Sequence, residues 1–456
     1  MAGFIVSVSK NNNIEELIRN GMYASNLPKE FDSAKSKMIA YSTLADYFSI
    51  KNGDNIYFLK ERKIYGVGKI IGLNNMMFFE NYPNSSCLDS FDEHVKTLDE
   101  NNDSNARWIC FFEPELKFFK NGVDMDDVLQ YKPASFRMLR AFQDRSFIKI
   151  DDEENAALKE FIYLRNRNND LFYDYNYKKR DRLLKEELHN YFLSNQKLLK
   201  NNKLVDGRLS LEMLLEAMLI KHINEYGIFN ENWDYISHQV IASPFKPLSY
   251  IDKMDIFAYR FLEYPHENKP IEKYLVLELK KDKADINTIQ QTMRYVDWIC
   301  KEYASGDYSL VKAGVIAFEY GNLDSLQDTI SRTFISSTHP IVTQKWNDLT
   351  CLTYKVSPSY ELKLKEFKYF NKEKYLKDEF DRLGIIYETS AFTRNKKTMK
   401  SIIHNKEKKF AVINSIEKDT IDILKSINWT VCIIDENDNQ ETIRLKINAL
   451  LEIKQK

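Results

Sequence analysis

The chain has 456 residues, of which 66 are basic and 67 acidic, so its formal net charge is −1. A hydrophobic fraction of 43%, with only 13 glycines and 10 prolines, excludes collagen-like, low-complexity and disordered chains. The balanced charge means that any surface for nucleic acid must be a local patch. At about 100–200 residues per domain, the length predicts two to four domains.

Cysteine usage and the N-terminal residues bear on the cellular compartment. Five scattered cysteines without a Cys-x-x-Cys pair argue against a zinc knuckle and against a disulfide framework, and they fit a reducing compartment. The N-terminus lacks the basic and apolar regions of a signal peptide, and no run approaches about 18 uncharged apolar residues. We therefore expect a cytoplasmic protein that does not associate with a membrane.

Residues 1–165 have the pattern of a small, strongly curved β-sheet with a few helices. A strand at 3–9 is followed by two apolar-alternating runs over 54–72, and the charged turn between these runs is typical of a hairpin. A further strand is predicted at 107–114. A helix begins near Asp151, where acidic residues suit the positive end of the helix dipole.

The rest of the chain divides into three segments by composition. Residues 166–204 are highly charged, with Leu and Tyr at helical spacing, and predict a helical connector. Residues 205–360 predict the order αβββαβ, an α/β core with a mixed sheet. Its elements are a helix at 210–226, strands at 236–243, 254–264 and 272–282, a helix at 285–304 and a strand at 310–320. Residues 361–456 predict a small α/β domain, so the fold class is α/β and multidomain.

Three charged residues occur on two neighbouring apolar strands: Asp255, Glu278 and Lys280. Because alternate residues of a strand share a face, Glu278 and Lys280 project together, while Leu277 and Leu279 point to the buried side. Charges on such a strand are destabilising unless they serve each other or a cation. Two carboxylates make an oxygen-rich site that suits Mg²⁺, for which Mn²⁺ can substitute.

The chemistry that such a site can perform is the hydrolysis of a phosphodiester bond. A divalent cation can polarise a phosphoryl oxygen and generate hydroxide from bound water. A lysine beside it can position or deprotonate that water, or stabilise the charge of the transition state. The simpler alternative is a solvated Glu–Lys pair on an edge strand.

The charged residues belong to a longer ordered set. An aspartate is followed by Glu-x-Lys on the next strand and by Gln-x-x-x-Tyr on the following helix. The members of this set are Asp255, Glu278, Leu279, Lys280, Gln291 and Tyr295. Their order resembles the PD-(D/E)XK nuclease superfamily over about residues 205–330, and the Gln–Tyr element resembles its recombination and repair branch. Many members have proline before the aspartate, where this chain has Met254.

The resemblance implies roles for these side chains. The implied catalytic set is Asp255, Glu278, Lys280, Gln291 and Glu216, and the implied metal ligands are Asp255, Glu278 and the Leu279 carbonyl. Lys280 would assist the attacking water, and Gln291 would orient Lys280 or a phosphate. Members often carry a metal-linked glutamate on the preceding helix, where Glu212 and Glu216 both occur; Glu216 is preferred, but the choice between them stays open.

The N-terminal segment contains three short motifs: Gly53–Asp54 before a strand, Tyr65–Lys69 (YGVGK) in the next strand, and Arg145–Phe147 before the closing helix. Their order resembles the EVE domains of the PUA-like superfamily, which form a β-barrel. The resemblance implies a reader of modified bases in DNA, notably modified cytosine. Independently, glycines at 66 and 68 permit strong curvature or close backbone approach.

Two further groups of residues are candidates for contact with DNA. A barrel mouth lined with aromatic rings can hold a flipped base, and the candidates here are Trp108, Tyr41 and Tyr65. The alternative for each ring is a place in the core. Between residues 394 and 409, seven basic residues stand against one acidic residue, which would neutralise phosphates unless they form an ordinary solvated face. The candidates for backbone contact are Arg394, Lys396, Lys397 and Lys400.

These patterns predict a metal-dependent DNA endonuclease of the modification-dependent, type IV-like restriction class. Residues 1–165 would read a modified base, and residues 166–204 would connect this domain to the nuclease domain. Residues 205–360 would cut DNA, and residues 361–456 would contact DNA or mediate dimerisation. Because cutting two strands needs two active sites, a homodimer is expected. The alternatives are a repair or anti-phage nuclease that reads nucleic-acid structure, and a nucleic-acid-binding protein without catalysis on a nuclease fold.

Overall fold

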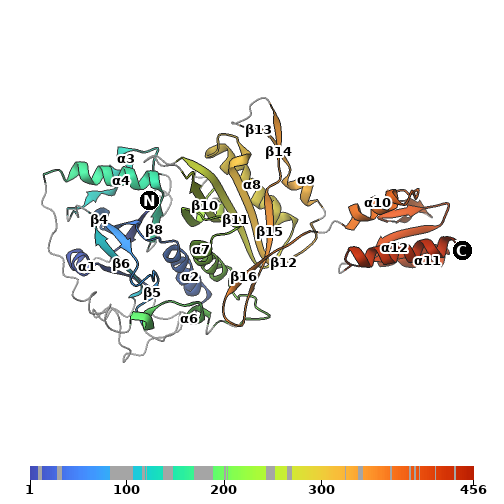
Figure 1. Cartoon of the computed structure of the whole chain (residues 1–456), viewed down its shortest axis with the longest axis horizontal. Helices are drawn as coiled ribbons and strands as arrows, with labels where there is room; N and C mark the ends of the chain where they lie inside the picture. The colour runs from blue at the N-terminus through green and yellow to red at the C-terminus, as the bar shows by residue number, and fades with distance from the viewer. Residues whose placement is uncertain are drawn as a thin grey trace. The chain divides into compact units, whose positions relative to one another are not determined.

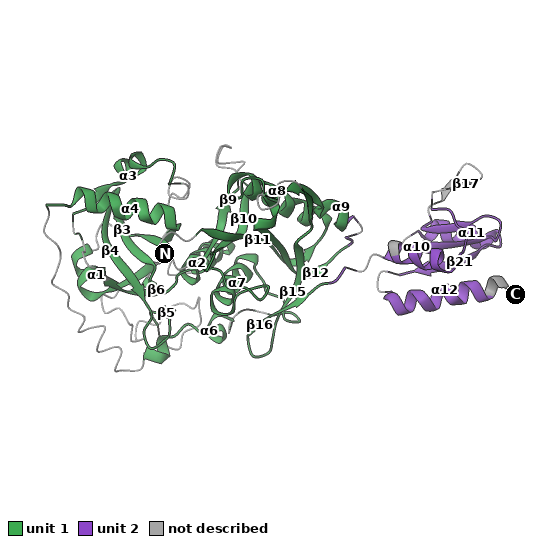
Figure 2. Cartoon of the chain, turned by 45° about the horizontal axis from the view of Figure 1, so that its top comes forward, with its two compact units in different colours: residues 1–321, 326–367 green, residues 322–325, 368–456 purple. Residues whose placement is uncertain are grey.

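The computed structural model of the chain forms two compact units (Figures 1 and 2). The first comprises Met1–Gly321 with Leu326–Phe367, and the second comprises Asn322–Ser325 with Lys368–Lys456. The residues that the structure describes are 1–8, 13–27, 33–82, 106–115, 119, 121–136, 147–168, 188–199, 202, 204–242, 252–263, 270–323, 325–336, 342–369, 372–389, 392–394, 397–399, 401–415, 417–435 and 438–455.

A curled sheet forms the N-terminal part of the first unit. Its strand order is β2-β6-β4-β3-β1-β8, with β5 paired to β6 and β7 to β4. The strands are β1 Gly3–Ser7, β2 Met22–Asn26, β3 Asn55–Lys60, β4 Lys63–Ile71, β5 Phe79–Glu80, β6 Ala106–Pro114, β7 Val123–Asp124 and β8 Phe147–Ile150. Among the described residues the path from β2 to β8 does not close, so the sheet is a half-barrel. The predicted curved sheet is therefore confirmed, and the PUA-like barrel stays a prediction.

The hairpin expected at 54–72 is formed by β3 and β4, which pair antiparallel. Its turn residues Glu61 and Arg62 have φ values of 49° and 67°, the left-handed conformation that two-residue hairpin turns require. Gly66 has a φ of 73°, and the register of the two strands shifts opposite it. Glycine at this position thus allows the bulge that bends β4, as the sequence predicts.

Helices pack against the curled sheet, and capping residues mark where they begin. They are α1 Ile14–Asn20, α2 Ala34–Phe48, α3 Met125–Tyr131 and α4 Asp152–Arg165. The start of α4 is a capping box, in which Asp151 and Glu154 each accept a hydrogen bond from the other's backbone N–H. In the predicted connector the described residues form two short helices, η1 Leu188–Tyr191 and α6 Asn195–Leu199. Residues 169–187, most of that connector, lie outside the described residues.

A six-stranded mixed sheet follows, with the order β16-β15-β12-β11-β10-β9. Strands β11, β12 and β15 pair in parallel, and the remaining neighbours are antiparallel. The elements of this region are α7 Glu212–Tyr226, β9 Tyr235–Ile241, β10 Lys253–Phe261, β11 Ile271–Ala284, α8 Ile286–Glu302, η3 Tyr308–Leu310, β12 Val311–Tyr320, α9 Leu326–Ile330, β13 Arg332–Ile335, β14 Thr343–Trp346, β15 Leu349–Val356 and β16 Leu362–Glu366. The predicted order αβββαβ is confirmed.

Different helices cover the two faces of the central sheet. On one face, Leu277 and Leu279 of β11 belong to the same hydrophobic core as Leu214 of α7. On the other face, Phe257 and the residues in register with it lie on the side of α8. The hydrophobic core that contains Leu277 and Leu279 continues through α2, which lies beside α7, to Trp108 in the curled sheet (Figure 1). Both sheets of the first unit therefore share one core.

The second unit is a small α/β fold, and it begins at Lys368, not at residue 361, apart from Asn322–Ser325. Strands β19, β20 and β21 form its sheet, and β17 pairs with β18. The elements are α10 Lys372–Arg382, β17 Phe392–Arg394, β18 Lys397–Met399, β19 Ile403–Asn405, β20 Phe410–Asn414, α11 Lys418–Ser426, β21 Thr430–Ile434 and α12 Gln440–Gln455. Within the described residues of the whole chain, no helix is both long and apolar enough to cross a membrane.

Replacing Asp285 by alanine is expected to lower the free energy of unfolding by about 1 kcal/mol, because it removes the N-terminal cap of α8. The Asp285 carboxylate accepts hydrogen bonds from the backbone N–H groups of Asn287 and Thr288 at 3.0 and 3.1 Å. Urea denaturation measures the change. Asp282→Ala, which removes an exposed aspartate outside the helix, is the control and should change stability by less than about 0.5 kcal/mol. Equal losses in the two variants would contradict the capping role.

Candidate active site

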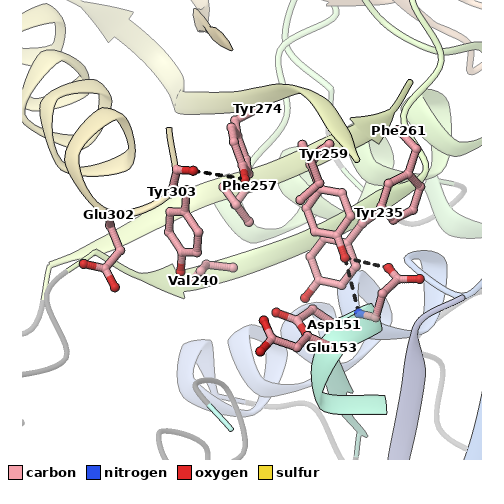
Figure 3. A pocket seen from close by; sticks show the side chains of 12 residues that line it. Asp151, Glu153, Tyr235, Val240, Phe257, Tyr259, Phe261, Tyr274, Glu302 and Tyr303 are labelled. Carbon is pink, nitrogen blue, oxygen red and sulfur yellow. Dashed lines mark hydrogen bonds between the residues drawn. The ribbon is translucent and has the colours of Figure 1, made fainter. Parts of the chain in front are cut away.

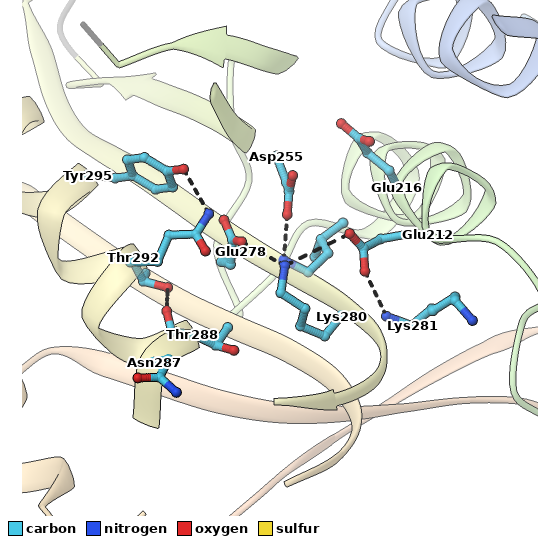
Figure 4. Close-up of polar contacts among 12 residues, drawn as sticks. Glu212, Glu216, Asp255, Glu278, Lys280, Lys281, Asn287, Thr288, Thr292 and Tyr295 are labelled. Carbon is cyan, nitrogen blue, oxygen red and sulfur yellow. Dashed lines mark hydrogen bonds and ion pairs between the residues drawn. The ribbon is translucent and has the colours of Figure 1, made fainter. Parts of the chain in front are cut away.

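Asp255, Glu278 and Lys280 lie together on the central sheet (Figure 4). The antiparallel register of β10 and β11 brings Asp255 beside Glu278. The Asp255 carboxylate accepts a hydrogen bond of 2.8 Å from the backbone N–H of Leu279, and the Lys280 ammonium lies 2.9 Å from a Glu278 oxygen. The predicted common face of Glu278 and Lys280 is therefore confirmed.

The two carboxylates are held close together in a poorly solvated place. Burial raises the pKa of Asp255 well above its ordinary value, and the nearby Glu278 and Glu216 carboxylates raise it further. Burial also raises the pKa of Glu278, whose side chain is 1% exposed, although the Lys280 ammonium acts against this rise. Within the described part of the chain, the Oε2 atom of Glu278 has no hydrogen-bond partner. A divalent cation would stabilise such a pair.

Lys280 carries a positive charge beside this pair. Burial lowers the pKa of Lys280, but the carboxylates of Glu278 and Glu212 outweigh burial, so the net pKa is raised. A protonated amine donates hydrogen bonds and cannot accept a proton. Of the roles open to this lysine, positioning water and stabilising negative charge are therefore favoured over deprotonation. The Glu212 carboxylate lies 3.9 Å from the Lys280 ammonium and also accepts a hydrogen bond from the backbone N–H of Lys281.

Glu216 reaches the site through a residue that the sequence did not indicate. Its carboxylate, 2% exposed, accepts hydrogen bonds from the Gln239 amide at 3.3 Å to each oxygen. The same amide nitrogen donates to Asp255 at 3.2 Å. Gln239 has a left-handed φ of 51°, which is uncommon for a residue other than glycine and turns its side chain between the two carboxylates. Glu216 thus lies nearer Asp255, and Glu212 nearer Lys280.

His238 connects this site to the curled sheet. Its Nδ1 lies 3.0 Å from Glu216, and its Nε2 lies 2.8 Å from Asp46 of α2. The imidazole is fully buried between these two carboxylates. Sequence reasoning missed both His238 and Gln239. The available signal was three polar residues in succession, Ser237 to Gln239, within an otherwise apolar strand.

Gln291 and Tyr295 of α8 also lie at the site. The Gln291 amide donates a hydrogen bond of 2.9 Å to the Tyr295 hydroxyl. Burial raises the pKa of Tyr295 to about 12, with further contributions from Glu278 and Asp255 that show how near those carboxylates lie. No hydrogen bond joins Gln291 to Lys280 among the described residues, so its predicted orienting role stays a prediction.

The aromatic residues proposed for a base pocket lie mostly in the core of the curled sheet. Trp108 is fully buried and stacks on Tyr47 with ring centroids 6.3 Å apart. Tyr41 is buried in the same cluster, and its hydroxyl accepts a hydrogen bond from Asn202. Tyr65 is half-buried against this cluster. These positions match the core alternative, and their use as a base pocket stays a prediction.

For several other candidate residues, the structure describes no side-chain contacts. Arg394 and Lys397 belong to strands β17 and β18. Lys396 and Lys400 lie outside the described residues, as do Arg145 and Ser146 of the EVE-like motif. The predicted contact of the basic cluster with DNA therefore stays a prediction.

The donor set of the site fits a magnesium ion better than a transition metal. No group of three or more His, Cys, Asp or Glu side chains gathers as a metal site in the described residues. Mg²⁺ needs fewer protein ligands, since it keeps several waters and often binds one or two carboxylates. Asp255 and Glu278 supply that number, and the unpartnered Oε2 of Glu278 is an oxygen ligand of the right kind.

Comparisons with known proteins give partial matches to solved structures. No protein-family model matches the sequence, and no curated protein sequence is similar to it. Part of the chain is similar to the crystal structure of a repair endonuclease from Pyrococcus abyssi, with 23% identity and a TM-score of 0.17. The match covers 25% of this chain and 42% of that chain. A likeness of this extent carries no argument about activity, which rests on the site geometry.

The stabilising effect of His238 is expected to disappear at alkaline pH. Burial lowers the pKa of His238, but the carboxylates of Asp46 and Glu216 raise it overall to about 9. Because this value lies above the ordinary histidine pKa of about 6.5, the protonated ring stabilises the fold below pH 6.5, and that stabilisation is lost as the pH rises through about 9.

Urea denaturation of the wild type and His238→Gln at several pH values tests this effect. The difference in free energy of unfolding should be on the order of 3 kcal/mol at about pH 6 and should shrink as the pH approaches about 9. The control is His222→Gln, because burial lowers the pKa of His222 and its effect should not fade between neutral and alkaline pH. A constant difference for His238→Gln would contradict the assignment.

Binding of Mg²⁺ to Asp255 and Glu278 is expected to release protons. Because their pKa values are raised, the pair holds its protons to a higher pH than free carboxylates do, and a bound cation favours the ionised carboxylates. Calorimetric titration with Mg²⁺ in two buffers of different ionisation heat should therefore give different apparent heats, and affinity should increase with pH. Asp255→Asn should weaken binding and reduce proton release. Tight binding without any buffer dependence would count against this pair as the ligands.

Proposed function

We propose that this chain is a metal-dependent nuclease that hydrolyses phosphodiester bonds in DNA. The observation that carries the proposal is a pair of neighbouring carboxylates with raised pKa values, the half-buried Asp255 and the buried Glu278. Among the residues that the structure describes, Oε2 of Glu278 has no hydrogen-bond partner. The ammonium of Lys280 lies beside them. Two carboxylates and an ammonium on adjacent strands provide cation binding and charge stabilisation in one place.

Each residue of the site has a proposed task. Asp255 and Glu278, with the carbonyl of Leu279, would hold Mg²⁺ or Mn²⁺. The bound ion would supply polarisation of the phosphoryl oxygen and a nucleophilic hydroxide. Lys280 donates hydrogen bonds to the attacking water or to the charge that develops on the phosphate. Gln291, held by the Tyr295 hydroxyl, would contact the neighbouring phosphate.

Glu216 acts on this site through another side chain. By accepting from the Gln239 amide, whose nitrogen lies 3.3 Å from each of its oxygens, it fixes the nitrogen that also donates to Asp255. Asp255 then keeps the orientation in which its second oxygen accepts from the Leu279 N–H. We therefore propose that Glu216 supports the metal ligands and that Glu212 orients Lys280.

The finer proposal is a modification-dependent, type IV-like restriction endonuclease. Its support is the EVE-like order of motifs in residues 1–165 and the curled half-barrel that these residues form. In this proposal the N-terminal sheet finds a modified base, and a homodimer supplies one active site for each strand. The alternative is a repair or defence nuclease whose N-terminal sheet reads nucleic-acid structure.

Removing the ammonium of Lys280 should abolish most cutting without abolishing binding to DNA. Lys280→Ala is expected to lower the cleavage rate by about 10²–10⁴-fold, because positioned charge and proton donors contribute effects of that size. The measurement is digestion of matched plasmids with and without cytosine modification, in Mg²⁺ and in EDTA. The control is Lys281→Ala, which removes an exposed lysine next in the chain and paired with Asp282.

The outcomes of this digestion separate the candidate functions. Cutting of only the modified plasmid supports the restriction function, and equal cutting of both supports the nuclease that reads structure. If wild type and Asp255→Asn behave alike in Mg²⁺ and in Mn²⁺, and both still bind DNA, the chain binds without catalysis and the nuclease proposal is overturned.

A further inference from the structure

A pocket of about 360 Å³ lies within the first unit, on the face of the central sheet that carries the candidate active site (Figure 3). Aromatic rings from β9, β10 and β11, and from the residue after α8, form its walls. The first residues of α4 bring three carboxylates to its edge, and Glu302 adds a fourth. Pockets of this volume hold small ligands such as a single aromatic ring system.

Two strands that line the pocket also carry residues of the candidate active site. Phe257, in its wall, follows Asp255 by two residues, which on one strand face is about 7 Å. Val240, also in its wall, is the neighbour of Gln239, which donates to Asp255. A DNA strand whose phosphate lies at the carboxylate pair would thus place a nearby base within reach of the pocket.

The rings at the base of the pocket are buried, since Tyr235 and Tyr259 are 2% and 5% exposed. The half-buried rings of Tyr303 and Phe261 therefore supply the surface on which a base can stack. Tyr235 and Tyr259 stack with centroids 4.6 Å apart and planes 6° apart, and the Tyr259 hydroxyl donates to Asp152 at 2.6 Å. Tyr303 packs 5.6 Å from Phe257 and is only half-buried, so part of its ring faces the open side. Bases stack on such rings whatever their sequence, because every base has a π-face.

The carboxylates decide which part of a nucleic acid can enter. Asp151 and Glu153 would repel a phosphate, since like charges at short range are unfavourable, whereas the charge of Asp152 is offset by its ion pair with the N-terminal ammonium of Met1. Carboxylate oxygens accept hydrogen bonds from N–H groups, and the exocyclic amino groups of cytosine, adenine and guanine supply these. Thymine has no amino group and can donate only from its ring N3–H. The occupant with the best fit is therefore a base that carries an amino group.

We propose that this pocket binds an unstacked nucleobase with an exocyclic amino group, from the strand whose backbone lies at Asp255 and Glu278. The inference rests on the proposed nuclease function and adds a site to it. It concerns a different place from the predicted pocket of the curled sheet, where Trp108 and Tyr41 are buried. The pocket would select the base beside the cut.

Binding of single-stranded oligonucleotides in EDTA tests the proposal without cleavage. Three oligonucleotides of equal length are compared by fluorescence anisotropy: one of cytosine, one of thymine and one with abasic positions. Full-length wild type should bind the cytosine strand about tenfold more tightly than either other strand. Tyr303→Leu, which removes a half-buried ring but keeps apolar volume, should abolish most of this preference.

Two further variants and one competitor complete the design. Tyr308→Leu removes a half-buried tyrosine outside the pocket, which contacts Asp297 and Trp346, and should keep the preference. If Tyr303→Leu does not fold, Phe261→Leu takes its place, because it also removes a ring of the pocket.

Free cytidine should compete at least about tenfold more weakly than the cytosine strand, because it lacks the backbone contacts. Equal competition would assign the pocket to a free nucleoside and overturn the proposal.

Plasmid digestion by the same preparations separates the failure of this proposal from that of the nuclease function. A wild type that cuts plasmid in Mg²⁺ yet binds the three strands equally, or a Tyr303→Leu variant with unchanged preference, overturns the base pocket alone. A wild type that neither cuts nor binds any strand overturns the nuclease function, and the base pocket with it.

Discussion

The repulsion between Asp255 and Glu278 is the constraint on which the candidate active site depends. Like charges beside each other on neighbouring strands destabilise a sheet, and burial raises the cost further. The apolar residues around them impose this arrangement, because Leu277 and Leu279 are buried against α7 and fix the register. A slip by one residue would turn the carboxylates into that core. Core packing thus holds a charge pair that only a cation, a proton or Lys280 can relieve.

A chain of buried polar contacts connects this pair to the curled sheet. It runs from Asp46 through His238, Glu216 and Gln239 to Asp255, and each step lies between 2.8 and 3.3 Å. Buried networks of this kind are rigid when every member has its partner. The two sheets were predicted as separate domains, yet they share a core and this network within one compact unit. Events at α2 can therefore act on the orientation of Asp255.

Local patterns made the elements and the charge pair predictable. Period 2 in the apolar runs was enough to place Glu278 and Lys280 on one face, since alternation is a property of any strand. The partners of His238 were not predictable, because Asp46 is 192 residues away in the chain. The left-handed backbone of Gln239 leaves no mark in the sequence either. The acidic start of α4 was interpreted correctly as a helix terminus, but its place beside β10 depends on tertiary packing.

The surroundings of the pocket favour a neutral base over an organic cation, although carboxylates and aromatic rings could attract either. The ammonium of Lys149 lies behind the Tyr235 ring, 4.8 Å from its centroid, and donates to the carbonyls of Ser49 and Ile236. Burial lowers the pKa of Lys149 to about 7, so it is charged in a large fraction of molecules at neutral pH. A cation in the pocket would be repelled by that charge. A base donates N–H groups without carrying a charge, and so avoids this repulsion.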